Sequence, residues 1–198
     1  MCGIAGIVNR GGSRIEQKQI DLLTDAVAHR GPDGRGTWLN SAGDIALGHR
    51  RLSILDTSSN GHQPMSYDNG RYWISLNGEI YNFLEIRKEL ESEGCTFQSE
   101  SDTEVVLASY KMWGKEMLHR FNGMWAFAIY DTEEHSLFLS RDRYGVKPLY
   151  YCNTNSNFYF SSEVQAIHKI VGRSHPLNKN VINDIVGGGM QNFAFDES

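Results

Sequence analysis

Cys2 has the residue type and position best suited to covalent chemistry, because it directly follows the initiator methionine. Methionine is usually removed when the second residue is small, and cysteine is small. Removal would leave a thiol and a free α-amine on one residue, groups whose ordinary pKa values are about 8.5 and about 7.7–8.0. Only the thiolate is strongly nucleophilic, and the amine could serve as its base, as in N-terminal threonine hydrolases. The alternative is a small buried cysteine that opens a strand.

Asn77-Gly78 offers a side-chain amide and an unhindered backbone N–H next to each other. Asn-Gly is a strong turn signal, so we expect a strand over residues 72–76 that ends in a turn here. Such a pair of donors suits an oxyanion hole, in which the loss of one donor typically lowers the rate about 10²–10³-fold. A plain hairpin turn is the alternative interpretation.

Two charged residues could hold the ends of a zwitterionic substrate. Arg51 lies in a predicted strand, where it would share one face with His49, and could clamp a carboxylate with two hydrogen bonds. Asp102 could bind an ammonium group. Their alternatives are a surface ion pair for Arg51 and the N-cap of a helix for Asp102. Residue types alone do not show that these groups converge.

Composition excludes several classes of function. The chain has 198 residues, 40% of them hydrophobic, which suits one sizeable domain with a real core. Its net charge is −5 and it has no run of lysine or arginine, so no nucleic-acid partner is expected. The three cysteines, Cys2, Cys95 and Cys152, form no CxxC pair, so neither a zinc site nor a disulfide framework is indicated. A reducing compartment follows.

The sequence shows neither a signal peptide nor an apolar run of about 18 residues, so we expect a cytoplasmic protein without a membrane partner. Hydrophobic periodicity and turn residues predict mixed α and β structure with antiparallel strands. Ser13 and Glu16 read as a capping box. Helices are expected from there to about His29 and over residues 84–93, 103–113 and 164–170. Strands are expected over residues 2–8, 37–39, 45–55, 72–76, 95–98, 124–130, 136–140, 149–152 and 158–161, the last four as a meander. Residues 180–186 form a further segment before the triple glycine at 187–189.

Seven segments, in order, resemble one known family. They are Cys2-Gly-Ile-Ala-Gly, His29-Arg-Gly-Pro-Asp, Arg51-Leu-Ser-Ile, Gly61-His-Gln-Pro-Met, Leu76-Asn-Gly-Glu-Ile-Tyr-Asn, Ser101-Asp-Thr-Glu-Val and Arg141-Asp-Arg-Tyr-Gly-Val-Lys-Pro-Leu-Tyr-Tyr. Together they resemble the class II glutamine amidotransferase domain of the asparagine synthetase (glutamine-hydrolysing) type, over residues 2–171. The fifth and seventh segments separate it from the phosphoribosyl-pyrophosphate and glucosamine-phosphate amidotransferases.

The resemblance implies an N-terminal nucleophile hydrolase fold, an α+β four-layer αββα sandwich of two antiparallel sheets between helical layers. It also implies roles. Cys2 would attack the side-chain amide of L-glutamine, Asn77 and the Gly78 N–H would hold the oxyanion, and the α-amine of Cys2 would handle the proton. Arg51 would bind the α-carboxylate of the substrate, and Asp102, with Glu79 near it, would face its α-ammonium. No metal or cofactor is expected in this domain.

The same resemblance implies a partner. The family carries an ATP-dependent synthetase domain, in which ATP and Mg²⁺ are expected, with a Ser-Gly-Gly-x-Asp-Ser loop that is not found in this sequence. Residues 172–198 would then be a linker or the start of that part, and a homodimer is left open. The ammonia would go to aspartate in asparagine biosynthesis, or to a sugar or antibiotic acceptor. A catalytically silent interaction module and a hydrolase of another amide remain alternatives.

Overall fold

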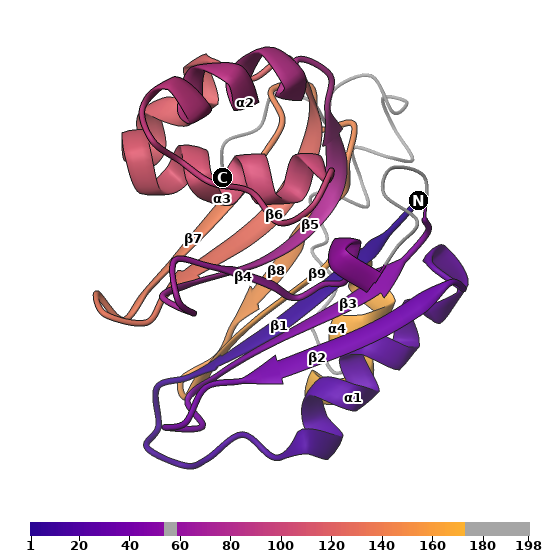
Figure 1. Cartoon of the computed structure of the whole chain (residues 1–198). Coiled ribbons are helices and arrows are strands. Elements are labelled where there is room, and N and C mark those ends of the chain that lie inside the picture. Colours follow the sequence, from indigo (N-terminus) through magenta and orange to yellow (C-terminus); the bar gives the residue numbers. More distant parts are fainter. Residues whose placement is uncertain (54–58, 173–198) are drawn as a thin grey trace.

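The fold, in a computed structural model that describes residues 1–53 and 59–172, is a sandwich of four layers. Two antiparallel sheets lie face to face, with α1 and α4 covering one and α2 and α3 covering the other (Figure 1). This is the αββα arrangement of two antiparallel sheets that the resemblance implied for the N-terminal nucleophile hydrolase fold.

The first sheet has β1 at its centre. Its strand order is β2 (Gly34–Leu39), β3 (Ile45–Arg51), β1 (Gly3–Asn9), β9 (Asn157–Ser161) and β8 (Tyr150–Asn153). Gly3 lies opposite Arg50 on one side of β1, and Ala5 lies opposite Ser161 on the other. The N-terminal strand is therefore held between β3, which follows it early in the chain, and β9, near the end of the described residues, and this fixes the position of Cys2 just before it.

The second sheet has the order β4 (Met65–Tyr67), β5 (Tyr72–Ile80), β6 (Gly123–Asp131) and β7 (Ser136–Arg141). β4 pairs only with the first residues of β5, from Tyr72 to Ile74. The remainder of β5 therefore has β6 on one side and an uncovered edge on the other, and that edge is where the functional site forms.

The helices cover the outer faces of the sheets. The α-helices are α1 (Gln17–Ala26), α2 (Phe83–Ser92), α3 (Asp102–Trp113) and α4 (Val164–Val171), and short 3-10 turns are η1 (Ala28–Arg30), η2 (Ser59–Gly61) and η3 (Gly114–His119). Ile20, Leu23 and Val27 are fully buried on the inner face of α1, as their spacing predicted. Within residues 1–53 and 59–172, no helix has the length and hydropathy to cross a bilayer.

The core has three layers that follow from this packing. One cluster lies between the second sheet and α2 and α3, a second lies between the first sheet and α1 and α4, and a third joins the two sheets. The third contains Ile45 and Leu47 of β3, Ala128 and Tyr130 of β6, and Phe160 of β9. Both outer layers are thereby held against one rigid double sheet.

Several local predictions were wrong. Asn77-Gly78 is not a turn but lies inside β5, opposite Ala126 and Trp125. Residues 95–98 form no strand, because the Gln98 N–H turns toward the Glu104 carboxylate. Glu16, not Ser13, caps α1 together with Gln19.

The predicted meander is divided between the sheets. β6 and β7 continue the second sheet after β5, whereas β8 and β9 form a hairpin that joins the first sheet beside β1. The strand expected over residues 45–55 ends at Arg51. The expected segment 180–186, the triple glycine and most of the stretch 172–198 lie outside the described residues.

Candidate active site

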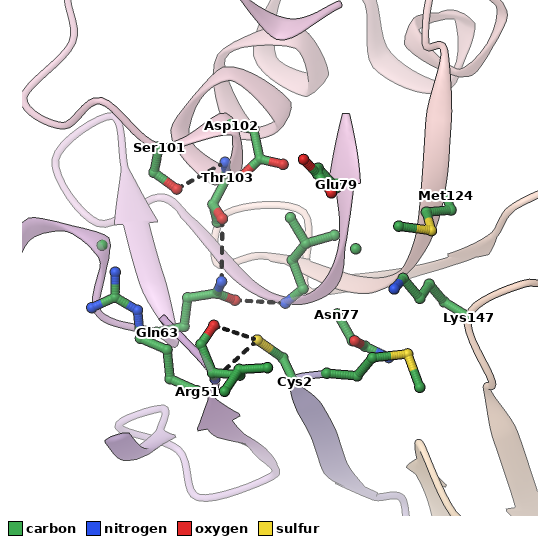
Figure 2. A pocket seen from close by; sticks show the side chains of 15 residues that line it. Cys2, Arg51, Gln63, Asn77, Glu79, Ser101, Asp102, Thr103, Met124 and Lys147 are labelled. Atoms are coloured by element: carbon green, nitrogen blue, oxygen red, sulfur yellow. Dashed lines mark hydrogen bonds between the residues drawn. The ribbon is translucent and has the colours of Figure 1, made fainter. Parts of the chain in front are cut away.

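A cavity of about 260 Å³ collects the residues that the sequence singled out. It is lined by Cys2, Arg51, Asn77, Gly78, Glu79 and Asp102, together with Met1, Leu52, Gly61, Gln63, Leu76, Ser101, Thr103, Met124 and Lys147. These residues come from both sheets and from the start of α3 (Figure 2). All six predicted site residues therefore converge.

Cys2 is half-buried, and its sulfur sits against the chain that leaves β3. The Leu52 N–H donates to Cys2 Sγ at 3.4 Å, and Sγ lies 3.6 Å from the Leu52 carbonyl oxygen. Arg30 Nε donates to the Cys2 carbonyl at 2.9 Å, and Arg30 in turn pairs with Glu163 at 3.1 Å. The nucleophile candidate is thus held from the backbone on both sides, while its sulfur faces the cavity.

The Gly78 N–H points toward the uncovered edge of β5. In an antiparallel pair, the N–H and C=O of one residue point to the same side. Trp125 lies opposite Gly78, and on the β7 side its N–H donates to the Asp142 side chain while its carbonyl accepts from the Asp142 N–H. Gly78 and Trp125 are therefore not hydrogen-bonded to each other. The N–H groups of Leu76 and Ile80, two residues before and after Gly78, donate at the same edge to Gln63 Oε1 and Asp102 Oδ2.

Glycine is required at position 78 by close packing. A Cβ there would lie 2.6 Å from the Met124 carbonyl oxygen and 2.8 Å from the Trp125 Cα. Asn77, beside it, is 1% exposed, and its Nδ2 is buried without a hydrogen-bond partner in the described part of the chain. A buried amide donor is rarely left unpaired. Asn77 Nδ2 and the Gly78 N–H are therefore two donors suited to an oxygen atom supplied by a substrate.

Gln63 closes the edge of the cavity with two hydrogen bonds. Its Oε1 accepts from the Leu76 N–H at 2.6 Å, and its Nε2 donates to Thr103 Oγ1 at 3.2 Å. Gln63 thereby connects β5 to the start of α3. Its neighbourhood, Gly61-His-Gln-Pro-Met, was quoted for its resemblance, but no role was assigned to Gln63 from the sequence.

Asp102 and Glu79 bring two carboxylates to the same wall. Asp102 is 5% exposed, and Ser101, not Asp102, is the N-cap of α3, since the Ser101 hydroxyl accepts from the Thr103 N–H. Burial raises the pKa of Asp102 above its ordinary value, and the negative charge of Glu79 adds to this, against hydrogen bonds from the Ile80 and Thr103 backbone. Two neighbouring carboxylates, one of them desolvated, form a site that favours the binding of a cation.

Arg51 lies at the end of β3 and lines a different wall of the cavity from Asp102 and Glu79 (Figure 2). The alternation predicted for this strand is confirmed. His49 turns inward, where its Nε2 donates to the Leu76 carbonyl at 3.0 Å, whereas Arg50 turns outward to Asp25 on α1. Burial lowers the pKa of His49 to about 3, so the ring is neutral, and Arg51 is the cation that β3 contributes to the cavity.

The structure adds residues that sequence reasoning did not assign. Gln63, Thr103, Met124 and Lys147 all line the cavity. Lys147 was visible only as one letter of a quoted segment, because its place in the cavity depends on pairing between distant strands. The described residues contain no cluster of three or more His, Cys, Asp or Glu side chains arranged to hold a metal ion.

Comparison with known proteins agrees with this geometry. The chain matches, over residues 1–194, a family model described as a glutamine amidotransferase domain. The chain belongs to the glutamine amidotransferase domain family. It is 42% identical over 170 residues to asparagine synthetase [glutamine-hydrolyzing] 1 of Bacillus subtilis, a match that covers 84% of this chain and 26% of that protein.

A second relative is a putative asparagine synthetase [glutamine-hydrolyzing] 2 of Methanocaldococcus jannaschii, 39% identical over 200 residues, covering 92% of this chain and 38% of the relative. Among solved structures, the phosphoribosylpyrophosphate amidotransferase of Bacillus subtilis superposes with a TM-score of 0.71 at 24% identity, over 86% of this chain and 44% of that one. The latter likeness concerns the fold. This glutamine amidotransferase domain spans about a quarter to two fifths of the length of the two synthetases.

Proposed function

We propose that this domain hydrolyses L-glutamine to L-glutamate and ammonia, with Cys2 as the nucleophile. One observation carries the proposal. The sulfur of Cys2 shares a small cavity with the buried Asn77 Nδ2, which has no hydrogen-bond partner among the described residues, and with the cation of Arg51 and the carboxylates of Glu79 and Asp102. A nucleophile, oxyanion donors and charges of both signs are the parts that hydrolysis of an amino-acid side-chain amide requires.

The charges account for recognition of the two ends of glutamine. Arg51 would bind the α-carboxylate with its planar guanidinium, and Asp102, with Glu79, would bind the α-ammonium. Arg51 and Asp102 lie on different walls of the cavity (Figure 2), so an amino acid held between them directs its side chain toward Cys2 and Asn77. An amide that lacks the α-amino and α-carboxyl groups would leave both charged walls unpaired.

The chemistry then proceeds in two steps. The α-amine of Cys2 takes the thiol proton as Cys2 Sγ forms a bond to the amide carbon, and the electron pair of the C=O bond moves to the oxygen, which Asn77 Nδ2 and the Gly78 N–H stabilise. The C=O bond then re-forms as the C–N bond breaks, the nitrogen takes the proton back from the α-ammonium of Cys2, and ammonia departs and leaves a thioester. Water attacks the thioester carbon and releases glutamate and the free thiol.

This route requires removal of Met1, because in an intact chain the nitrogen of Cys2 is an amide and cannot accept the thiol proton. Met1 lines the cavity and is 56% exposed, so an aminopeptidase can reach it. We therefore propose that the active form lacks Met1 and begins at Cys2.

For the whole protein we propose an ammonia-transferring synthetase. The support is the identity to asparagine synthetases over a portion of their length. A synthetase part, on the same chain or on a partner, would use ATP and Mg²⁺ and pass the ammonia most simply to aspartate. We place residues 172–198 at the junction with that part and the protein in the cytoplasm.

The decisive experiment measures glutamate release from glutamine by wild-type protein and by Cys2→Ala, with Cys152→Ala as a matched control on the far side of the first sheet. We expect activity in the wild type and the control, and none in Cys2→Ala. Intact mass should show that the active protein lacks Met1. Glutamate release by Cys2→Ala, or full activity with Met1 attached, would refute the mechanism and favour an interaction module.

A further inference from the structure

Lys147 is a buried cation that the mechanism above does not use. It is 6% exposed and lines the same cavity as Cys2, Asn77 and Met124. In Figure 2 its side chain extends into the cavity from the side opposite Arg51, on the side of Asn77. Its place beside Asn77 is therefore at the reacting end of the substrate, and in the same view Glu79 lies between it and Asp102.

The ammonium of Lys147 has no counter-ion in the described part of the chain. None of the ion pairs among residues 1–53 and 59–172, which extend to an N–O distance of 4.0 Å, includes it. The side chain is mostly buried and lines the cavity, so its charge acts on whatever occupies the cavity with little screening by bulk water. At the reacting end, the negative charge that such a cation can face forms on the substrate while the amide is being transformed.

The backbone holds Lys147 rigidly in this position. Its N–H donates to Asp142 Oδ2 at 3.0 Å, and its carbonyl accepts from Arg141 Nε at 2.8 Å. Asp142 also accepts from the N–H groups of Tyr144 and Val146 in the same loop and of Trp125 on β6. Burial works against the charge of Asp142, but these backbone donors outweigh it and lower its pKa, so the anchor is ionised at neutral pH.

We propose that Lys147 is a third electrostatic element of the oxyanion site, added to the two hydrogen-bond donors at positions 77 and 78. When Cys2 Sγ bonds to the amide carbon, the C=O electron pair becomes a full negative charge on oxygen. A positive charge fixed in advance on the side of Asn77 stabilises that charge and requires no reorganisation when it forms. The ground-state amide is neutral and gains far less, so the effect falls on the transition state.

The competing role is charge balance. Lys147 could instead offset the Glu79 and Asp102 carboxylates, which together exceed the single α-ammonium of a bound amino acid. The two roles predict different kinetics. Charge balance at the binding wall changes the affinity for glutamine in the ground state, whereas oxyanion stabilisation changes kcat and the affinity for an analogue that forms an oxyanion.

The test uses Lys147→Met, which keeps the side-chain length without the charge, and Lys147→Arg, which keeps the charge. Lys18→Met is the matched control, since Lys18 is exposed on α1 and pairs with the exposed Glu16. The probes are glutamine, for kcat and KM, and glutamate γ-semialdehyde, whose aldehyde carbon bonds to Cys2 Sγ and places negative charge on its oxygen. Thermal unfolding checks each variant, and Lys147→Gln serves if the methionine variant does not fold.

We expect Lys147→Met to lower kcat about tenfold or more and to weaken the aldehyde by a similar factor, with the KM for glutamine changed less than about twofold. Lys147→Arg should restore most of both losses, and Lys18→Met should behave as wild type. A change confined to KM, or unaltered kcat and aldehyde affinity, would overturn the role assigned to Lys147. The inference rests on the proposed glutaminase function: wild-type protein without glutaminase activity would overturn that function, whereas an active wild type with an unaltered methionine variant would overturn only this inference.

Discussion

Asp102 Oδ2 accepts a hydrogen bond from the Ile80 N–H at 3.0 Å. This bond connects the first residue of α3 to the edge of β5, the strand that carries Asn77 and Gly78. One carboxylate therefore completes the sheet edge and forms part of the wall where we place the α-ammonium of glutamine. Recognition and oxyanion stabilisation are mechanically joined through three residues of backbone.

Asp102→Asn should separate stability from binding. The pKa of Asp102 is raised above its ordinary value of 3.8, so as pH increases the unfolded chain loses this proton before the folded protein does. Stability contributed by the group is therefore present below pH 3.8 and declines until pH passes the folded-state pKa. Asparagine does not ionise and can still accept from the Ile80 N–H.

We expect the thermal midpoint of Asp102→Asn, measured without substrate, to rise relative to that of the wild type as pH increases from about 4 to about 7. At the same time the KM for glutamine should rise, since truncating one partner of a buried charged contact costs on the order of 2–5 kcal/mol. Glu100→Gln, at an exposed neighbouring carboxylate, is the control. If the thermal midpoint of the wild type instead rises relative to that of the variant as pH increases, this account is contradicted.

Asn77→Ala should act on the chemical step. Asn77 Nδ2 is buried and has no hydrogen-bond partner among the described residues, so it can donate to a bound molecule. We expect kcat to fall about 10²–10³-fold while the KM for glutamine changes little. Steady-state glutamate release measures both constants. An increase in KM with unchanged kcat would assign Asn77 to ground-state binding instead.

Gly78→Ala should damage the fold and the site together. The new methyl group would lie 2.6 Å from the Met124 carbonyl oxygen on β6, which cannot move away freely because β6 is paired on both sides. Overpacking of this kind typically destabilises by about 1–3 kcal/mol. Chemical denaturation should show the loss. Gly94→Ala gives a comparison in which only backbone strain contributes, because a methyl group added there would meet no heavy atom within 4 Å, whereas the backbone has φ +91°.

His49→Gln should reduce the sensitivity of the protein to mild acid. Burial lowers the pKa of His49 from 6.5 to about 3. As pH falls through 6.5 the unfolded chain takes up a proton that the folded protein refuses, so stability is lost until pH approaches the folded-state pKa. Between about pH 7.5 and pH 5 this loss is about 2 kcal/mol.

Denaturation of wild type and His49→Gln at these two pH values provides the measurement. Glutamine retains a donor for the Leu76 carbonyl and does not titrate, so the gap in stability between wild type and variant should narrow at the lower pH. His119→Gln, at a histidine whose side chain is 74% exposed, should leave the pH dependence as in wild type. A constant gap would show that folding does not shift the pKa of His49, and a gap that widens toward the lower pH would show that folding raises it; either result would contradict this account.

The sequence by itself determined the chemistry on offer. Cys2 behind the initiator methionine, Arg51, Glu79 and Asp102 are recognisable as a nucleophile and charged groups by type, and the ordered segments around them identify the family. The helices could also be predicted from the sequence, because the burial of Ile20, Leu23 and Val27 on one face of α1 follows from a local repeat of about 3.6 residues per turn.

Only the tertiary structure decided where those groups face. Asn77-Gly78 has local turn preference, yet the ladder with β6 holds it in a strand, and tertiary pairing outweighs local propensity. Because β4 is short, the edge of β5 remains open for hydrogen-bond donors. β7 and β8 belong to different sheets, and the segment that connects them carries Lys147 into the cavity that holds Cys2. The pairing of β5 with β6 joins residues about fifty positions apart, and the cavity joins Cys2 to Lys147 more than a hundred positions away. Contacts at such ranges depend on the packing of whole layers, which local patterns do not encode.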